Sequence, residues 1–167
     1  KAFTLLETLI ALGILAIIST IVVLLINPVQ FFAQSRDARR VNDIGRIKTA
    51  INLGKNSLDE TLTGYSTLPN NIVYVSLPDT DSNDLCNEYA LPSLTSGWSY
   101  RCMAPSTDLK KVDGNGWIPI VFTSVSTNPL TSLPIDPINN ANYYYAYTKD
   151  NGSSTVIESD KYITEIA

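Results

Sequence analysis

The chain of 167 residues contains no histidine, only two cysteines and a single methionine. Without histidine it cannot build a Ser-His-Asp or Cys-His relay, or a zinc site that needs imidazole ligands. Two cysteines are too few for a four-thiolate zinc or iron–sulfur site. The net charge of −4 also argues against general binding to nucleic acid. We therefore expect a protein that is not an enzyme.

Charge is missing from one long stretch of the sequence. No charged residue lies between Glu7 and Arg36, and residues 9–26 are apolar except for one glycine, one serine and one threonine. As a helix this run would rise about 27 Å, close to the roughly 30 Å of a bilayer's hydrocarbon layer. The pattern predicts a membrane span or a helix buried on all sides. Because the run is long for a signal peptide and no A-x-A-like site follows it, we expect it to be retained.

A second, amphipathic helix is predicted after Pro28. Its apolar residues fall mostly three or four positions apart, namely Val29, Phe32, Ala33, Val41, Ile44, Ile47, Ala50 and Ile51. The other face is predicted to carry the charged residues Arg36, Asp37, Arg39, Arg40, Asp43, Arg46 and Lys48. Since proline lacks an N–H and its ring clashes with the preceding turn, we expect a kink or a melted turn near residues 24–27. The helix should end within residues 54–57.

From residue 58 the sequence is rich in Ser, Thr, Asn, Pro and Tyr, with short β-type runs. Strands are predicted over residues 71–77, 98–102, 117–123, 143–148, 155–158 and 162–166. Asn151-Gly152 is a strong hairpin signal between two of them. The predicted fold class is therefore α+β, in which a long N-terminal α-helix is packed by a small antiparallel β-sheet head domain. The helix covers residues 1–57, apolar over 3–26 and amphipathic over 28–57, and the head domain covers 58–167.

The charges are divided among these segments. Residues 1–35 are neutral overall, residues 36–55 carry a net charge of +4, and residues 56–167 carry −8. The basic segment could contact anionic headgroups beside a membrane span, or match the charge of another subunit. A solvated helix face is an equally good interpretation.

The first residues carry the most specific pattern. Phe3-Thr4-Leu5-Leu6-Glu7 opens the apolar helix, and residues 1–15 resemble the N-terminal methylation motif of type IV pilins and of type II secretion pseudopilins. Leu133-Pro134-Ile135-Asp136-Pro137, followed by Tyr143-Tyr144-Tyr145, also resembles the Pro-x-Asp-Pro…Tyr segment of many Gram-positive-type pilins and major pseudopilins. The chain is most similar to a major type IV pilin.

This resemblance implies the life cycle of a filament subunit. A prepilin peptidase would cleave between Ala2 and Phe3 and methylate the new amine; in the alternative, Lys1 is the mature N-terminus. The subunit would stay in the cytoplasmic membrane as a single-pass protein until an assembly platform and an ATPase move it into an extracellular helical homopolymer. Glu7 would pair with the N-terminal amine of a neighbouring subunit, because a buried carboxylate needs a cationic partner. Phe3, Glu7 and Pro28 are the predicted assembly residues.

Cys86 and Cys102 enclose a loop in the polar half of the chain. In an exported protein we expect them to form a disulfide, which stabilises a loop of this size by roughly 3 kcal/mol. Its role would be to hold a Pro/Ser-rich loop that has little core of its own. Two reduced, buried thiols are the alternative.

Acidic residues gather in one part of the polar half. Asp79, Asp81, Asp84 and Glu88 offer oxygen ligands that could hold calcium. The segment lacks the glycine of an EF-hand and the spacing of its final glutamate. A solvated turn is therefore the preferred interpretation, and no cofactor is predicted.

Tyr143, Tyr144, Tyr145 and Tyr147 follow one another closely. On a strand, Tyr144 lies on the face opposite to the other three. Packing against the long helix would explain the tyrosines on one face of the strand. The other could serve packing, subunit contact, surface adhesion or base stacking on DNA. Packing is preferred, because no basic cluster accompanies the tyrosines.

The predicted function is a structural subunit of an extracellular type IV pilus, serving adhesion, twitching motility or DNA uptake, which the sequence does not separate. Two alternatives stay open: a type II secretion pseudopilin, and a single-pass membrane-anchored binding domain. The pilin and pseudopilin hypotheses require Glu7 for assembly. The anchored domain requires a ligand pocket instead.

Overall fold

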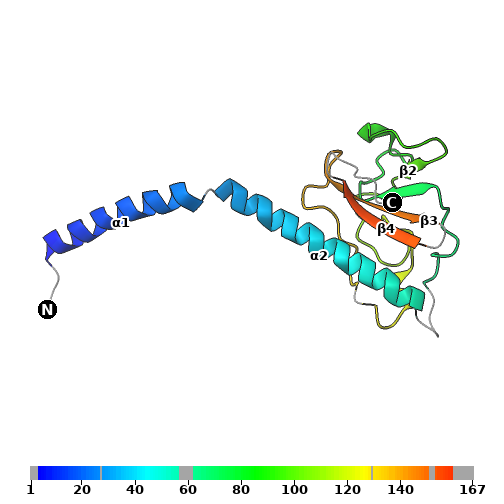
Figure 1. Ribbon diagram of the computed structural model, residues 1–167, viewed down its shortest axis with the longest axis horizontal. Helices are drawn as coiled ribbons and strands as arrows, with labels where there is room; N and C mark the ends of the chain where they lie inside the picture. The colour runs from blue at the N-terminus through cyan, green and yellow to red at the C-terminus, as the bar shows by residue number, and fades with distance from the viewer. Residues whose placement is uncertain (1–3, 27, 57–61, 129, 151–152, 160–167) are drawn as a thin grey trace. The chain divides into compact units, whose positions relative to one another are not determined.

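Figure 1 shows a computed structural model of the chain, which describes residues 4–26, 28–56, 62–128, 130–150 and 153–159. Two helices, α1 and α2, come first in the chain, and strands β1 to β4 follow them. The chain divides into two compact units, Lys1–Ala38 and Arg39–Ala167. We call the second the head unit; it contains the larger part of α2 and the sheet. The fold class is α+β, as predicted.

Helix α1 spans Leu5–Ile26 and helix α2 spans Pro28–Asn56. α1 ends at Ile26 and α2 begins at Pro28, and Asn27, the last residue of the range in which we predicted a kink, lies outside the described residues. Pro28 is the first residue of α2, a position where the missing N–H removes no helical hydrogen bond and the fixed φ suits the helix. The end of α2 at Asn56 also lies within the predicted range.

The buried face of α2 differs from the prediction. Within the head unit, buried residues recur at helical spacing: Arg40, Asp43, Ile47, Ala50, Ile51 and Gly54. Arg40 and Asp43, which we predicted on the charged outer face, are each only 6% exposed. Val41, which we predicted on the buried face, is 74% exposed. The prediction failed because it assigned faces by polarity, whereas Arg40 and Asp43 find hydrogen-bonding partners in the head unit.

The sheet has four strands: β1 Ile72–Val75, β2 Ser99–Arg101, β3 Tyr144–Asp150 and β4 Ser153–Ser159, in the order β2-β1-β3-β4. The predicted strands over 71–77, 98–102, 143–148 and 155–158 are confirmed. β3 and β4 pair antiparallel with Tyr147 opposite Val156, as the hairpin signal predicts. The expectation of a purely antiparallel sheet is wrong, because β1 pairs with β2 in parallel. Two parallel neighbours need a crossover connection, and the long segment over residues 76–98 provides it.

The predicted strand over residues 117–123 does not form. The segment contains a short 3₁₀ turn, Phe122–Ser124, and its backbone N–H groups donate to separate loops: Trp117 to Leu109, Val121 to Thr63 and Phe122 to Val112. Pro119 has no N–H for a ladder, which disfavours a central strand here. The β-type composition instead reflects burial, since Trp117 and Phe122 are fully buried. The last predicted strand, 162–166, lies outside the described residues.

Apolar clusters cover both faces of the sheet. The larger one combines Ile47 and Ile51 of α2 with Tyr145 and Tyr147 of β3 and with the buried loop around Trp117. The smaller one, on the other face, contains Val75, Leu77, Tyr144 and both cysteines. The alternation along β3 explains this division, because neighbouring strand residues point to opposite faces. Figure 1 agrees with it: α2 runs on one side of the sheet, and the segment before β2 lies on the other.

Candidate functional site: the apolar helix and the polar anchor

The first turn of α1 is held by a reciprocal pair of side chains. The backbone N–H of Thr4 donates to Glu7 Oε2 over 3.0 Å, and the N–H of Glu7 donates to Thr4 Oγ1 over 3.3 Å. This arrangement is a capping box, which satisfies N–H groups that the first helical turn leaves unpaired. The Thr4 hydroxyl also donates to Glu7 Oε2, over 3.1 Å. Glu7 therefore starts the helix with a carboxylate fixed beside its N-terminus, where a negative charge is favourable.

The side chains of α1 form an apolar surface on all sides. Thirteen of them are between 45% and 82% exposed: Leu5, Leu6, Leu9, Ile10, Leu12, Ile14, Leu15, Ile17, Ile18, Ile21, Val22, Val23 and Leu25. The hydroxyls of Ser19 and Thr20 donate to the carbonyl oxygens of Leu15 and Ala16, over 2.7 and 2.9 Å. These internal hydrogen bonds make both residues compatible with an apolar medium, because no hydroxyl donor needs a solvent partner.

Length and composition allow α1 to cross a membrane. Leu5–Val23 is a 19-residue segment of mean hydropathy 2.4, and none of it is buried within the protein. A membrane anchor has these properties, and so does a signal sequence near an N-terminus. The exposed apolar surface continues onto α2, where Val29, Phe31 and Phe32 are 74%, 63% and 61% exposed.

The structure describes some of the predicted assembly and processing residues and not others. Glu7 lies in the capping box and Pro28 begins α2, whereas Phe3 is outside the described residues together with Lys1 and Ala2. The cleavage site and the mature N-terminus therefore stay predictions. No contact in the described part of the chain brings Glu7 and Pro28 together.

A buried ion pair joins α2 to the loop that precedes β3. Arg40 Nε donates to Asp136 Oδ2 over 2.8 Å, and the two side chains are 8% and 0% exposed. Asp136 Oδ1 also accepts the backbone N–H groups of Ile138 and Asn139, over 2.7 and 3.3 Å. The Arg40 guanidinium lies over the ring of Tyr143, 5.0 Å from its centroid. One carboxylate thus holds the helix and its own loop at the same time.

A second contact lies one turn further along α2. The hydroxyl of Tyr145 donates to Asp43 Oδ2 over 3.2 Å, and Arg39 Nε is 3.7 Å from the same oxygen. We call Arg40, Asp43, Asp136, Tyr143 and Tyr145 the polar anchor. Both buried charges of α2 have partners in it, which is the condition for a buried charge to be tolerated.

The polar anchor was not predicted from the sequence, although the sequence contains two signals for it. Arg40 lies three, seven and eleven positions before Asp43, Ile47 and Ile51, which places it on the same helical face as the apolar residues. Asp136 lies between Pro134 and the next proline, in a segment noted only for its resemblance to pilins. No property of the sequence alone pairs an arginine with an aspartate 96 positions away.

The tyrosines of β3 are packed on both faces of the sheet. Tyr145 and Tyr147 are fully buried toward α2, and Tyr144 is 3% exposed on the face that carries the disulfide. The packing interpretation is confirmed for these three residues. They offer no exposed ring on which a nucleic acid base could stack.

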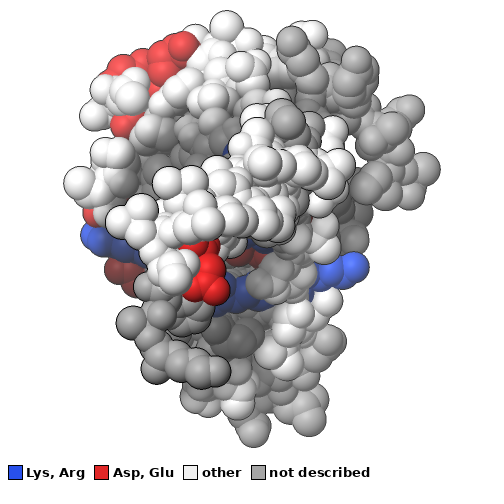
Figure 2. Space-filling view, turned by 90° about the vertical axis from the view of Figure 1, so that its left-hand side faces the viewer, with Lys and Arg blue, Asp and Glu red and all other residues white. Residues whose placement is uncertain are grey.

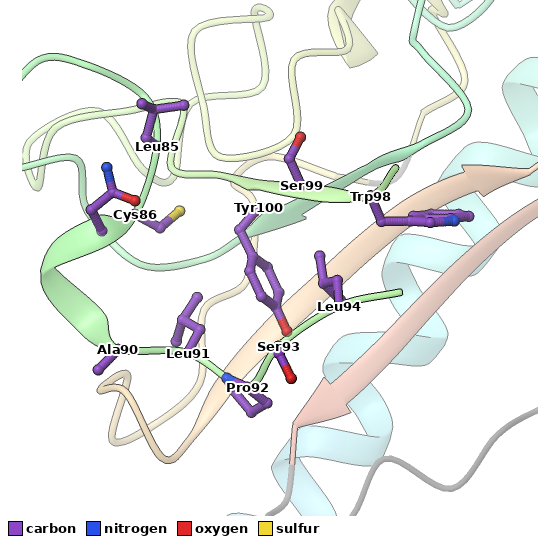
Figure 3. Close-up of a pocket in the computed structure, with 11 residues that line it drawn as sticks. Leu85, Cys86, Ala90, Leu91, Pro92, Ser93, Leu94, Trp98, Ser99 and Tyr100 are labelled. Atoms are coloured by element: carbon purple, nitrogen blue, oxygen red, sulfur yellow. The ribbon is translucent and has the colours of Figure 1, made fainter. Parts of the chain in front are cut away.

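Cys86 and Cys102 form a disulfide with Cα atoms 5.3 Å apart, as predicted. A pocket of about 350 Å³ lies beside it, lined by residues of the 85–94 segment and by Trp98–Tyr100. In Figure 3 the Tyr100 ring points toward Ser93, with Leu91 and Leu94 on either side. Burial, followed by the proximity of Tyr144, raises the pKa of the Tyr100 hydroxyl above its usual value. The pocket lining offers aromatic and hydrogen-bonding groups without a pair of titratable side chains for proton transfer.

Three carboxylates of the acidic segment lie close together. Oxygens of Asp79, Asp81 and Glu88 are within 4.8 Å of one another, and Asp84 is not a member of this group. Each of the three accepts hydrogen bonds from backbone N–H groups or a hydroxyl of the same loop. Such an oxygen set suits a hard cation. The internal hydrogen bonds account for the turn without one.

Comparison with protein families, with curated proteins and with solved structures gives no match to this chain. The features of the chain that bear on function are an exposed apolar helix with an acidic first turn, a head unit with its own core, and a disulfide.

Proposed function

We propose that this protein is the structural subunit of an extracellular helical filament of the type IV pilin kind. The observation that supports this most is the contrast between the two units. Among its described residues α1 exposes apolar side chains on all sides, and none of Leu5–Val23 is buried within the protein, whereas the head unit has a closed core of its own. A surface of this kind must be covered by lipid or by other copies of the helix, because exposed apolar patches this large are rare in water.

The position of Glu7 favours the filament over a simple anchor. A carboxylate in the first turn of a membrane span is costly in hydrocarbon, and intramembrane ionisable residues usually have a function. Both hydrogen bonds from Thr4 use Glu7 Oε2, so the other oxygen can accept the amine of a neighbouring copy. Because the Glu7 carboxylate would need to pair with a cation on the neighbouring subunit, it would select the axial register between copies.

In this proposal the subunit is first a single-pass membrane protein and then part of a polymer. A peptidase processes the N-terminus, and an assembly platform with an ATPase moves the subunit out of the membrane. These partners come from the resemblance to type IV pilins, as do the candidate roles in adhesion, motility and DNA uptake.

Electron microscopy of the full-length protein with a set of N-terminal variants tests the proposal. The wild-type protein should form long uniform fibres. Glu7→Gln keeps the hydrogen-bond acceptor of the capping box but removes the charge, so the protein should insert in the membrane, fold its head unit and fail to polymerise. Thr4→Ala is the matched control, since it weakens the cap and leaves the charge, and it should still assemble.

Two results would contradict the proposal. Wild-type protein that stays monomeric in detergent would favour a membrane-anchored domain, for which the pocket beside the disulfide would be the binding site to examine. Normal fibres from Glu7→Gln would show that the carboxylate charge has no part in assembly. Short fibres confined to the periplasm would indicate a pseudopilin.

A further inference from the structure

The outward face of α2 in the head unit is basic. Arg39, Arg46, Lys48 and Lys55 are all exposed, and we call them the basic face. The one acidic residue of α2 beyond Ala38 is Asp43, and it is buried in the polar anchor. Helical spacing places Arg39 and Arg46 on one flank of the outer surface and the two lysines on the other.

Gly45 and Thr49 lie on the ridge between these flanks. A methyl group added at Gly45 would have no atom within 4 Å, and Thr49 turns its hydroxyl back to the Gly45 carbonyl oxygen over 2.9 Å. Another chain could therefore approach this face closely. The four cations would stand at its borders.

The opposite charge is concentrated in the segment over residues 79–88. It carries Asp79, Asp81, Asp84 and Glu88, which we call the acidic surface, and no Lys or Arg occurs between Lys55 and Arg101. Burial, followed by the charges of Glu88 and Asp79, raises the pKa of the neighbouring Tyr89 hydroxyl. In Figure 2 acidic side chains gather at the upper left of the face shown.

The acidic surface has a fixed shape. Asp79 Oδ1 accepts the N–H of Ser82 over 3.0 Å, and Glu88 Oε1 accepts the Thr80 hydroxyl over 3.0 Å. The disulfide at Cys86 ties the same segment to the end of β2. Carboxylates held this close repel one another, so an incoming cation would relieve a cost already present in the fold.

The two charged surfaces belong to opposite sides of the head unit. α2 packs on the sheet face that carries Tyr145 and Tyr147, and the acidic segment with Cys86 packs on the face that carries Tyr144. Complementary surfaces on opposite sides of one body join copies head to tail. Such a contact does not close on itself as a two-fold contact does, and it can repeat along a helical filament.

We propose that the acidic surface of one copy binds the basic face of α2 on a second copy. The inference rests on the filament proposed above and adds the contact that sets the register of neighbouring head units. Arg46 and Lys48 are the central donors, because both are exposed and lie midway along the helix axis within the basic face, one on each flank. The contact is made at the surface, so salt should weaken it.

A charge-swap experiment on the full-length protein tests this contact. Arg46→Glu and Glu88→Lys should each raise the subunit concentration needed for assembly by about tenfold or more, because like charges then face each other. The double variant restores the attraction and should assemble within about threefold of wild type. Lys110→Glu makes the same charge change at an exposed site outside both surfaces and should have no effect. Thermal unfolding of each variant shows whether its head unit is intact.

The outcomes separate the two proposals. If the wild-type protein forms fibres and Arg46→Glu assembles as readily as Lys110→Glu, the proposed contact between head units is wrong, whereas the proposed filament is supported. Single defects that the double variant does not rescue would also overturn the pairing. If assembly requires calcium, and Glu88→Lys abolishes that requirement while Arg46→Glu has no effect, the acidic surface is a cation site instead. Failure of the wild type to form any fibre overturns both proposals.

Discussion

At the scale of single residues, Arg40 contributes to the fold through a buried charge. Its guanidinium is buried between Asp136 and the ring of Tyr143. Arg40→Met should lower the free energy of unfolding by about 3–5 kcal/mol, because it leaves a fully buried carboxylate without its cation. Chemical denaturation of the full-length protein in detergent measures this. Arg46→Met, on the exposed side of the same helix, should change the stability by less than about 0.5 kcal/mol.

A double variant distinguishes the ion pair from simple packing. Asp136→Asn keeps an oxygen for the N–H groups of Ile138 and Asn139 but removes the charge. The double variant that combines it with Arg40→Met should lose clearly less free energy of unfolding than the two single variants lose together, because no uncompensated buried charge remains. Strictly additive losses would show that Arg40 contributes through the packing of its stem alone.

Two tyrosines on one face of β3 should respond oppositely to loss of their hydroxyls. The hydroxyl of Tyr147 is buried and has no hydrogen-bond partner among the described residues, whereas that of Tyr145 donates to Asp43. Tyr147→Phe should be neutral or slightly stabilising, within about 0.5 kcal/mol. Tyr145→Phe should cost about 1.5–3 kcal/mol, because it removes a hydrogen bond to a charged group. Denaturant titration compares the two variants.

Tyr147→Phe should also change how the free energy of unfolding depends on alkaline pH. Burial raises the pKa of the Tyr147 hydroxyl above the value of about 10 that an unfolded chain has. Between the pKa of the unfolded chain and that of the folded protein, the folded protein keeps the hydroxyl proton and the unfolded chain releases it. The contribution of this group to the free energy of unfolding is therefore fully present below about pH 10 and is lost as the pH rises through this range. Tyr147→Phe should reduce the slope by about one proton. An unchanged slope would mean that this hydroxyl titrates normally.

At the scale of elements, two glycines separate helix propensity from close packing. Gly45 lies in the interior of α2 with open space around its Cα, so Gly45→Ala should stabilise the head unit by about 1 kcal/mol. At Gly116 a Cβ would meet the carbonyl oxygens of Lys111 and Leu109, so Gly116→Ala should cost about 1–3 kcal/mol or more. Thermal unfolding measures both. Equal effects of the two substitutions would contradict this assignment.

The elements that the sequence predicts are those with a local cause. The apolar run, Pro28 and the Asn-Gly hairpin each act within a few residues, and the structure confirms the two helices and the pairing of β3 with β4. The errors arose where distant segments decide. Parallel pairing of β1 with β2 depends on a crossover, and the buried segment around Trp117 donates its backbone hydrogen bonds to two distant loops, one at Thr63 and one over residues 109–112. The faces of α2 depend on Asp136, far along the chain.

At the scale of the whole molecule, the uneven distribution of apolar and charged residues along the chain corresponds to two units with different properties. The head unit contains every residue of the larger apolar cluster, from Ile47 to Tyr147, and both charged surfaces. Unit 1 supplies apolar surface, Glu7 at the start of α1, and the charged pair Arg36 and Asp37 near its last residue. A molecule of this kind folds one part by itself and leaves the other to be covered by lipid or by copies of itself.

This division predicts that the head unit folds without α1. A fragment of residues 34–167 keeps more than one helical turn before Arg40, so the polar anchor and both apolar clusters stay complete. It should be a soluble, cooperatively unfolding protein with an intact disulfide, and it should form no fibres at any concentration. Size-exclusion chromatography, denaturation and electron microscopy test these points.

A longer fragment isolates the effect of the apolar surface. Residues 28–167 add the first turns of α2, with Val29, Phe31 and Phe32 exposed, and no part of α1. This fragment should fold equally well but associate or bind detergent, because its only added feature is exposed apolar surface. If residues 34–167 fail to fold, the head unit depends on contacts from unit 1. If they form fibres, α1 is not the core of the polymer, and the proposed assembly through α1 is wrong.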